Sequence, residues 1–162
     1  MTDHGTSTAP LPFLDEHEVV IAADVSATWD ALVQTVDSSF STRPAAAYAR
    51  LVGGEPATAS GPRPLAFGST MPGFRVSSAV PGEELGLTGS HGFSTYALTF
   101  RVERQGDDCS RLRGESRALF PGLVGGLYRA LVVRSGAHAI LTRRLLSTVR
   151  HRAESERRDA VR

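Results

Sequence analysis

At 162 residues the chain has the length of one domain, and its apolar fraction of 41% and charged fraction of 22% are those of an ordinary globular protein. A net charge of +1 argues against a nucleic-acid-binding protein, which usually carries a basic excess. Cys109 is the only cysteine, which excludes an intramolecular disulfide framework and a cysteine-based metal site. No apolar run approaches the ~18 residues of a membrane span, and residues 1–12 lack the basic start and apolar core of a secretory signal. We therefore expect a cytoplasmic protein.

The two ends of the chain differ in composition from the rest. Residues 1–12 are rich in Thr, Ser, Gly and Pro, which predicts a disordered lead-in. Residues 13–153 are expected to form a single domain, because they contain no internal repeat and no linker. Residues 154–162 form a polar C-terminal tail, and the chain is expected to fray from His151 onward.

The first half of the chain predicts a strand followed by two short helices. In chain order we expect a strand at Glu16–Ala23, helices at Ser26–Ser38 and Arg43–Val52, a loop at 55–64 and a short strand near Leu65–Ser69. Asp24 or Ser26 can cap the first helix, and Pro44 suits the first turn of the second. Gly53 and Gly54 end that second helix.

From Gly73 onward the chain alternates with a period of two, which predicts four consecutive antiparallel strands with one face in water. The residues expected to face inward are Phe74, Val76, Ser78 and Val80, then Leu85, Leu87, Gly89 and His91, then Ser94, Tyr96, Leu98, Phe100 and Val102, and finally Leu112, Gly114, Ser116, Ala118 and Phe120.

A long helix is expected to begin near Leu123 and to run past Arg150. Its apolar stripe at helical spacing is Val124, Leu127, Leu131, Ser135, His138, Leu141, Thr142, Leu145 and Val149. This stripe would lie on the sheet, with His138 near its centre.

Three stretches resemble a known family: EHEVVIAADVSATWDAL, GFRVSSAVPGEELGLTGSHGFSTYALTF and FPGLVGGLYRALVVRSGAHAILTRRLL. Together with the order of elements, they resemble the START-like, or SRPBCC, superfamily over Phe13–Ala153. That superfamily includes the birch-pollen allergen group, polyketide cyclases and aromatases, and lipid-transfer domains, and the latter two stretches look like a subgroup of uncharacterised bacterial members. The resemblance implies an α+β helix-grip fold, in which a curved antiparallel sheet wraps around a long C-terminal helix and encloses a cavity. It does not fix a function, because fold alone never does.

Small residues on the inward face of the sheet also indicate a cavity. Gly114, Ser116 and Ala118 lie between larger residues on the last strand, where a close-packed core would place branched side chains. The alternative is that small residues allow the long helix to approach closely. The candidate cavity residues are His91, Ser94, Tyr96, Leu98, Gly114, Ser116, Ala118, Leu131, Arg134 and His138.

The two inward histidines, His91 and His138, can have a structural, a ligand-binding or a catalytic role. Arg134 can reach an acidic ligand group at the cavity mouth, or extend into solvent. No cofactor and no metal are expected, since the five histidines lack ligand-like spacing.

Two functions remain in view, with a pure interaction domain with a filled core as a third. The favoured function is a carrier or sensor that binds a small apolar or amphipathic molecule, because no acid or base partner of either histidine can be named. The alternative is an enzyme of the cyclase, aromatase or dehydratase kind, in which His91, Tyr96 and His138 act on a polyketide-like carbonyl compound.

Overall fold

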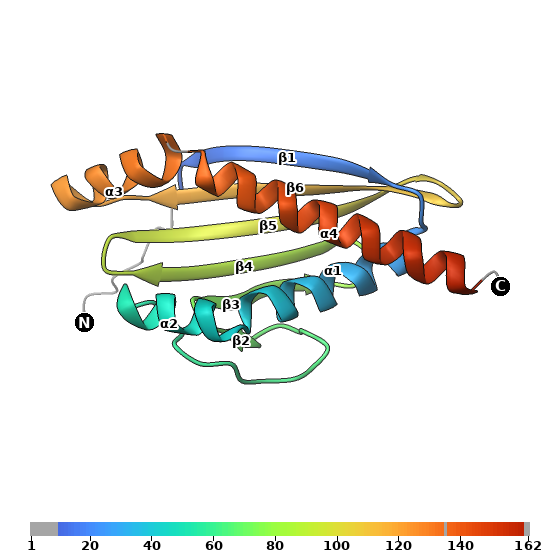
Figure 1. Cartoon of the computed structure of the whole chain (residues 1–162), viewed down its shortest axis with the longest axis horizontal. Coiled ribbons are helices and arrows are strands. Elements are labelled where there is room, and N and C mark those ends of the chain that lie inside the picture. Colours follow the sequence, from blue (N-terminus) through green and yellow to red (C-terminus); the bar gives the residue numbers. More distant parts are fainter. Residues whose placement is uncertain (1–9, 135, 161–162) are drawn as a thin grey trace, which may run out of the picture.

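The computed structural model describes residues 10–134 and 136–160, which form six strands and four helices (Figure 1). Their order is β1 (Phe13–Ile21), α1 (Val25–Phe40), α2 (Arg43–Leu51), β2 (Thr70–Met71), β3 (Phe74–Val80), β4 (Glu84–His91), β5 (Ser94–Gly106), β6 (Cys109–Leu119), α3 (Gly122–Arg134) and α4 (Ala137–Ala160). The strands make one antiparallel sheet in the order β1-β6-β5-β4-β3-β2. Helices α1 and α4 lie across one face of it, as the predicted α+β architecture requires.

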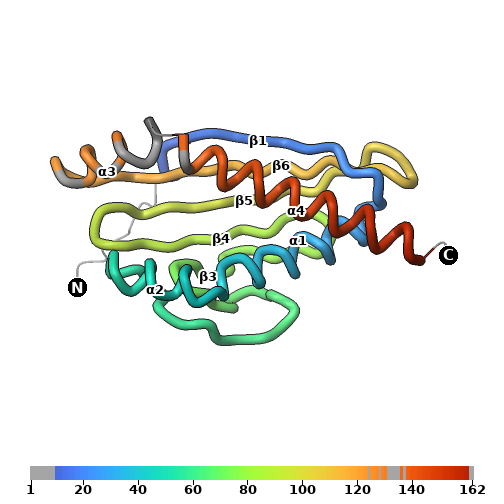
Figure 2. Tube along the Cα trace, viewed as in Figure 1, coloured from blue at the N-terminus to red at the C-terminus, as the bar shows by residue number. Residues whose placement is uncertain are grey.

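The two helices on the sheet are not parallel to each other. They approach each other toward the C-terminal end of α4, while α2 and the first turns of α4 lie apart at the opposite end of the sheet (Figure 2). One end of the inner face is therefore covered by two packed helices, and the other end is covered less completely.

Helix α1 begins where the sequence predicts, because Asp24 accepts a hydrogen bond from the Ala27 amide at 2.8 Å. Its buried face is Thr28, Ala31, Leu32, Val33, Thr35 and Val36. A buried hydrogen bond of 2.7 Å joins the hydroxyls of Thr28 and Ser110, which attaches this helix to β6. Both polar groups are thereby satisfied inside an apolar environment.

The hydrophobic core fills the end of the sheet where α1 and α4 meet. Its largest fully buried side chains include Phe100, Ile21, Leu32, Met71, Leu85, Leu87, Leu112 and Leu146. The opposite face of the sheet carries charged pairs, among them Arg101 with Glu84 and with Glu115. Arg117 also donates to Glu115, and this contact lowers the pKa of the Glu115 carboxyl.

The predicted single C-terminal helix is wrong, because the chain divides it into α3 and α4. Gly136 has a φ of +71°, in the left-handed region that ends helices, and its carbonyl accepts from the Ile140 amide in the first turn of α4. The predicted stripe is wrong in part, since Leu127 is 74% exposed and Leu141 is 65% exposed, whereas Thr142 and Val149 are buried as predicted. The buried positions of α4 are Thr142, Leu146, Val149 and Ala153. The side chains of Val124 and Leu131, and all of Ser135, lie outside the described residues.

The expected fraying from His151 is wrong as well, since α4 continues to Ala160. Ala153 is completely buried in the core. Glu154 accepts from the Ala22 amide at 3.1 Å, and Arg157 donates to the Ala22 carbonyl at 2.9 Å. Glu154 and Arg157 thus form hydrogen bonds with the backbone that connects β1 to α1, instead of pointing only into water.

Strand β3 departs from strict alternation. Its pairing with β4 shifts register between Val76 and Ser78, which is a β-bulge. The shift turns Ala79 toward the core, whereas Val80, predicted to face inward, is 45% exposed. The short strand expected near Leu65–Ser69 instead lies at β2.

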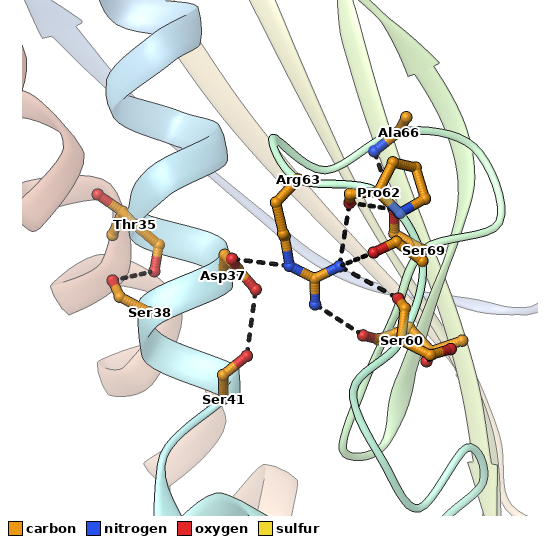
Figure 3. A network of polar contacts seen from close by, with 11 residues as sticks. Thr35, Asp37, Ser38, Ser41, Ser60, Pro62, Arg63, Ala66 and Ser69 are labelled. Atoms are coloured by element: carbon orange, nitrogen blue, oxygen red, sulfur yellow. Dashed lines mark hydrogen bonds and ion pairs between the residues drawn. The ribbon is translucent and has the colours of Figure 1, made fainter.

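The long connection between α2 and β2 is held in place by Arg63 (Figure 3). Its guanidinium forms an ion pair with Asp37 of α1, with Nε 2.9 Å from Oδ2. It also donates to the carbonyls of Ser60 at 3.1 Å and Thr70 at 3.0 Å. One side chain thus links this loop to a helix on one side and to the edge of the sheet on the other.

Candidate functional site

A cavity of about 720 Å³ lies at the less covered end of the sheet. Its floor is the inner face of β5 and β6, and its walls come from α1, α2, the end of β4 and the first half of α4. The lining is mainly apolar and includes Phe40, Phe74, Leu98, Ala118, Phe120 and Leu145. The cavity begins where the packed core of α1, α4 and the sheet ends.

Seven of the ten candidate residues line this cavity: His91, Ser94, Tyr96, Leu98, Ser116, Ala118 and His138. They come from β4, β5, β6 and α4, so the fold brings together positions that are far apart in sequence. The side chains of Leu131 and Arg134 lie outside the described residues. Gly114 is placed elsewhere, in the packed core.

Gly114 and Gly89 are small for a different reason than Ser116 and Ala118. A Cβ at Gly114 would lie 3.3 Å from the Phe100 ring and 3.5 Å from a Leu146 methyl group. A Cβ at Gly89 would lie 2.0 Å from the Gly73 carbonyl oxygen, which is impossible without rearrangement. At these two positions, therefore, the absence of a side chain allows neighbouring groups to pack closely and does not create cavity space.

His91 and Tyr96 form an aromatic group at one end of the cavity, with ring centroids 5.5 Å apart. Tyr96 donates its hydroxyl hydrogen to the Gly73 carbonyl at 2.8 Å. His91 accepts from the Phe93 amide through Nδ1 at 3.2 Å, so its neutral ring carries the proton on Nε2. Burial lowers the pKa of His91 below the usual 6.5. Both side chains therefore form hydrogen bonds with the backbone, and the hydroxyl hydrogen of Tyr96 is not available to a ligand.

The raised pKa of Tyr96 predicts that the free energy of unfolding falls at alkaline pH. Burial, together with the nearby Tyr48, raises the pKa of Tyr96 to about 12 from the usual 10. A folded-state pKa above the unfolded value stabilises the fold below pH 10, and this contribution disappears as the pH rises from 10 toward 12. Urea unfolding at several pH values should therefore show a steeper alkaline decline for the wild type than for Tyr96→Phe. Equal slopes for the two proteins would contradict this assignment.

A cluster that sequence reasoning missed lies beside the cavity, around Asp15 of β1. The Nε2 atom of His138 is 3.5 Å from Asp15 Oδ1, and the Nε2 atom of His17 is 3.3 Å from Asp15 Oδ2. On the far side of His17, Arg143 donates from Nε to Nδ1 at 3.4 Å. Asp15 is not among the candidate residues predicted from the sequence, yet it is the carboxylate nearest His138.

The alternation of β1 contains a signal for this cluster. Asp15, His17, Val19 and Ile21 share one face of the strand, and Ile21 is completely buried. The strand predicted from the sequence begins only at Glu16, which leaves Asp15 outside the predicted inner face. No group of three or more potential metal-ligating side chains was found within residues 10–134 and 136–160.

Ser116 is the most enclosed polar residue on the cavity wall. It is 2% exposed, and its hydroxyl has no hydrogen-bond partner among the residues that the structure describes. It pairs with Asp15 across β1 and β6, and with Leu98 across β5 and β6. Asp15 is thus a neighbour of both Ser116 and His138, two residues of the cavity lining.

Several solved structures share this arrangement of sheet and helices. A conserved protein from Geobacillus kaustophilus superposes with a TM-score of 0.52 at 11% identity, covering 86% of this chain and 94% of that one. The Zhui aromatase/cyclase from Streptomyces sp. R1128 gives 0.52 at 12% identity, covering 86% and 92%. Truncated norcoclaurine synthase from Thalictrum flavum gives 0.51 at 13% identity, covering 87% and 94%.

These similarities establish the fold, and at such low identity they establish nothing more. The chain has the helix-grip fold, with a curved, unclosed antiparallel sheet and a C-terminal helix on it. The fold predicted from the sequence is therefore confirmed. No family model matches the sequence, and no curated protein matches it. Among the described residues, no helix combines the length and the apolar character that crossing a membrane requires.

Proposed function

We propose that the cavity binds one small apolar or amphipathic molecule, and that the protein acts as its carrier or sensor. The observation that carries this proposal is the cavity itself, with a volume of about 720 Å³. Ligand pockets in proteins usually measure about 300–1,000 Å³, whereas voids in a close-packed core rarely exceed the size of a water molecule. A pure interaction domain with a filled core does not explain a hollow of this size.

The chemistry of the lining favours an apolar ligand with few polar groups. Aromatic and aliphatic side chains make most of the wall, among them Phe40, Phe74, Leu98 and Leu145. Tyr96 has already used its hydroxyl hydrogen on the backbone, so it contributes mainly its ring. Burying an apolar molecule against such a surface is favourable by about 25 cal/mol for each Å² removed from water.

A fluorescence titration with the neutral apolar dye N-phenyl-1-naphthylamine tests this proposal. We expect a saturable rise in emission with one dye molecule per chain, because we propose that one molecule occupies the cavity. Addition of a non-fluorescent competitor, naphthalene, should reverse the rise. A linear increase without saturation would indicate adsorption to the surface, and it would contradict the proposal.

One observation favours the enzymatic alternative, and it is the carboxylate beside His138. A histidine held by an aspartate is a common general base, and no such partner could be named from the sequence. The Zhui aromatase/cyclase and norcoclaurine synthase also show that proteins of this fold can be enzymes. The two functions differ in the fate of a bound ketone such as 2-tetralone in D₂O. A carrier leaves its α-hydrogens to exchange at the uncatalysed rate, whereas a cyclase-like enzyme accelerates this exchange.

A further inference from the structure

The enclosed hydroxyl of Ser116 marks a polar position within an otherwise apolar wall. Its neighbours in the cavity lining include Leu98 on β5 and Ala118 two residues along β6, neither of which has a polar side-chain atom. A buried hydroxyl without a partner is costly, so native proteins normally satisfy it. Ser116 lines the cavity, and a ligand that reaches its buried Oγ atom can supply the missing hydrogen bond.

Asp15 connects this serine to His138. Residues directly opposite each other in an antiparallel pair have Cβ atoms about 4.5–5.5 Å apart and side chains on the same face. Asp15 is the residue opposite Ser116 in the pairing of β1 with β6. Its Oδ1 atom is 3.5 Å from His138 Nε2, and both of these atoms are buried without a hydrogen-bond partner in the described structure. Ser116 and His138 line the cavity, whereas Asp15 is not part of the lining.

The contacts of Asp15 indicate which ring nitrogen of His138 can meet a ligand. His17 accepts from Arg143 at Nδ1, so its neutral ring presents an N–H at Nε2, the atom nearest Asp15 Oδ2. His138 likewise has Nε2 nearest the carboxylate, which favours a proton on that nitrogen. In the neutral ring Nδ1 is then the acceptor. Ser116 offers a donor and His138 offers an acceptor at the same side of the cavity.

We infer that Ser116 and His138 bind the hydroxyl group of a neutral amphipathic ligand, a phenol or an alcohol, with Asp15 as the positioning residue of His138. This inference rests on the proposed function. A hydroxyl accepts from Ser116 and donates to His138 Nδ1 at the same time, which a ketone or an ether does not. A carboxylate is disfavoured at this position because Asp15, the neighbour of both residues, carries like charge. Of the two arginines of the lining, Arg117 is paired with Glu115 and hydrogen-bonded to the Leu11 carbonyl, and Arg144 is exposed.

Competition against N-phenyl-1-naphthylamine at pH 7 with naphthalene, 2-naphthol and 2-naphthoate tests the inference. The three probes share one apolar frame and differ in the polar group. We expect 2-naphthol to bind about threefold to tenfold more tightly than naphthalene, the range for a net hydrogen bond. Ser116→Ala and His138→Leu should each remove this preference while the affinity for naphthalene stays unchanged. Asp15→Asn should reduce the preference in the same way, which a merely structural role would not do.

Thr95→Ala is the matched control, because it also removes a hydroxyl group from the sheet, but from an exposed side chain of β5 that does not line the cavity. This variant should retain the full preference for 2-naphthol. Equal binding of naphthalene and 2-naphthol by the wild type would overturn the hydroxyl site but not the proposed function. Tighter binding of 2-naphthoate would also overturn it, in favour of a cationic anchor. A dye that does not bind at all would contradict the proposed function itself.

Discussion

Replacing Phe100 with alanine is expected to lower the free energy of unfolding by about 3–5 kcal/mol, the usual cost of emptying a large core site. The Phe100 side chain is completely buried at the filled end of the sheet. Its ring lies against Gly114 on the adjacent strand, where even one added carbon would come within 3.3 Å. Because the surroundings are this tightly packed, they cannot collapse into the space that the ring leaves.

The same substitution at Phe67 provides the control, since that side chain is 75% exposed. Phe67→Ala should change the unfolding free energy by no more than about 0.5 kcal/mol. Urea or thermal unfolding of both variants measures the difference. Similar losses for the two phenylalanines would show that the core is not concentrated where the structure places it.

The meander of β4, β5 and β6 was predictable because each strand encodes its own inner face. Alternation in Ser94–Val102 and Leu112–Ala118 identifies the buried residues without reference to any other part of the chain. Helix α1 was predictable for a similar reason, since its cap and its buried face are local features. Such signals depend on neighbouring residues only, so one sequence is enough to read them.

The break between α3 and α4 was harder to predict, because one glycine interrupts an otherwise continuous helical pattern. Gly136 adopts a left-handed backbone conformation that glycine permits but does not require. A continuous helix places Leu141 on the sheet, whereas the observed α4 buries Thr142 and Leu146. Thr142 and Val149 belong to the predicted stripe and are buried, so the error is confined to part of it.

The polar cluster at the cavity could not be predicted from periodicity. Asp15 and Ser116 are opposite each other only because β1 pairs with β6 in one particular register. This pairing joins segments about 100 residues apart, and no local pattern encodes it. The sequence identified Ser116 and His138 as candidates separately, but their common neighbour depends on the tertiary structure.

A larger side chain on the floor of the cavity should weaken ligand binding without a large loss of stability. Ser116→Phe adds a ring at a wall position that borders the 720 Å³ cavity. We expect the affinity for N-phenyl-1-naphthylamine to fall by at least tenfold, which corresponds to ~1.4 kcal/mol. The unfolding free energy should change by less than the roughly 1–3 kcal/mol that overpacking of a full core costs. Urea unfolding of the variant measures the second quantity independently of the dye.

The central claim, that this domain is hollow and binds a ligand inside, is tested most directly by titrating the dye into wild type, Ser116→Phe and Thr95→Phe in parallel. Thr95 lies on β5 with an exposed side chain, so the control adds the same ring outside the cavity. We predict saturable binding of equal affinity to wild type and Thr95→Phe, and at least a tenfold weaker affinity for a stably folded Ser116→Phe. Undiminished binding to Ser116→Phe, or a loss of stability typical of an overfilled core, would contradict the claim.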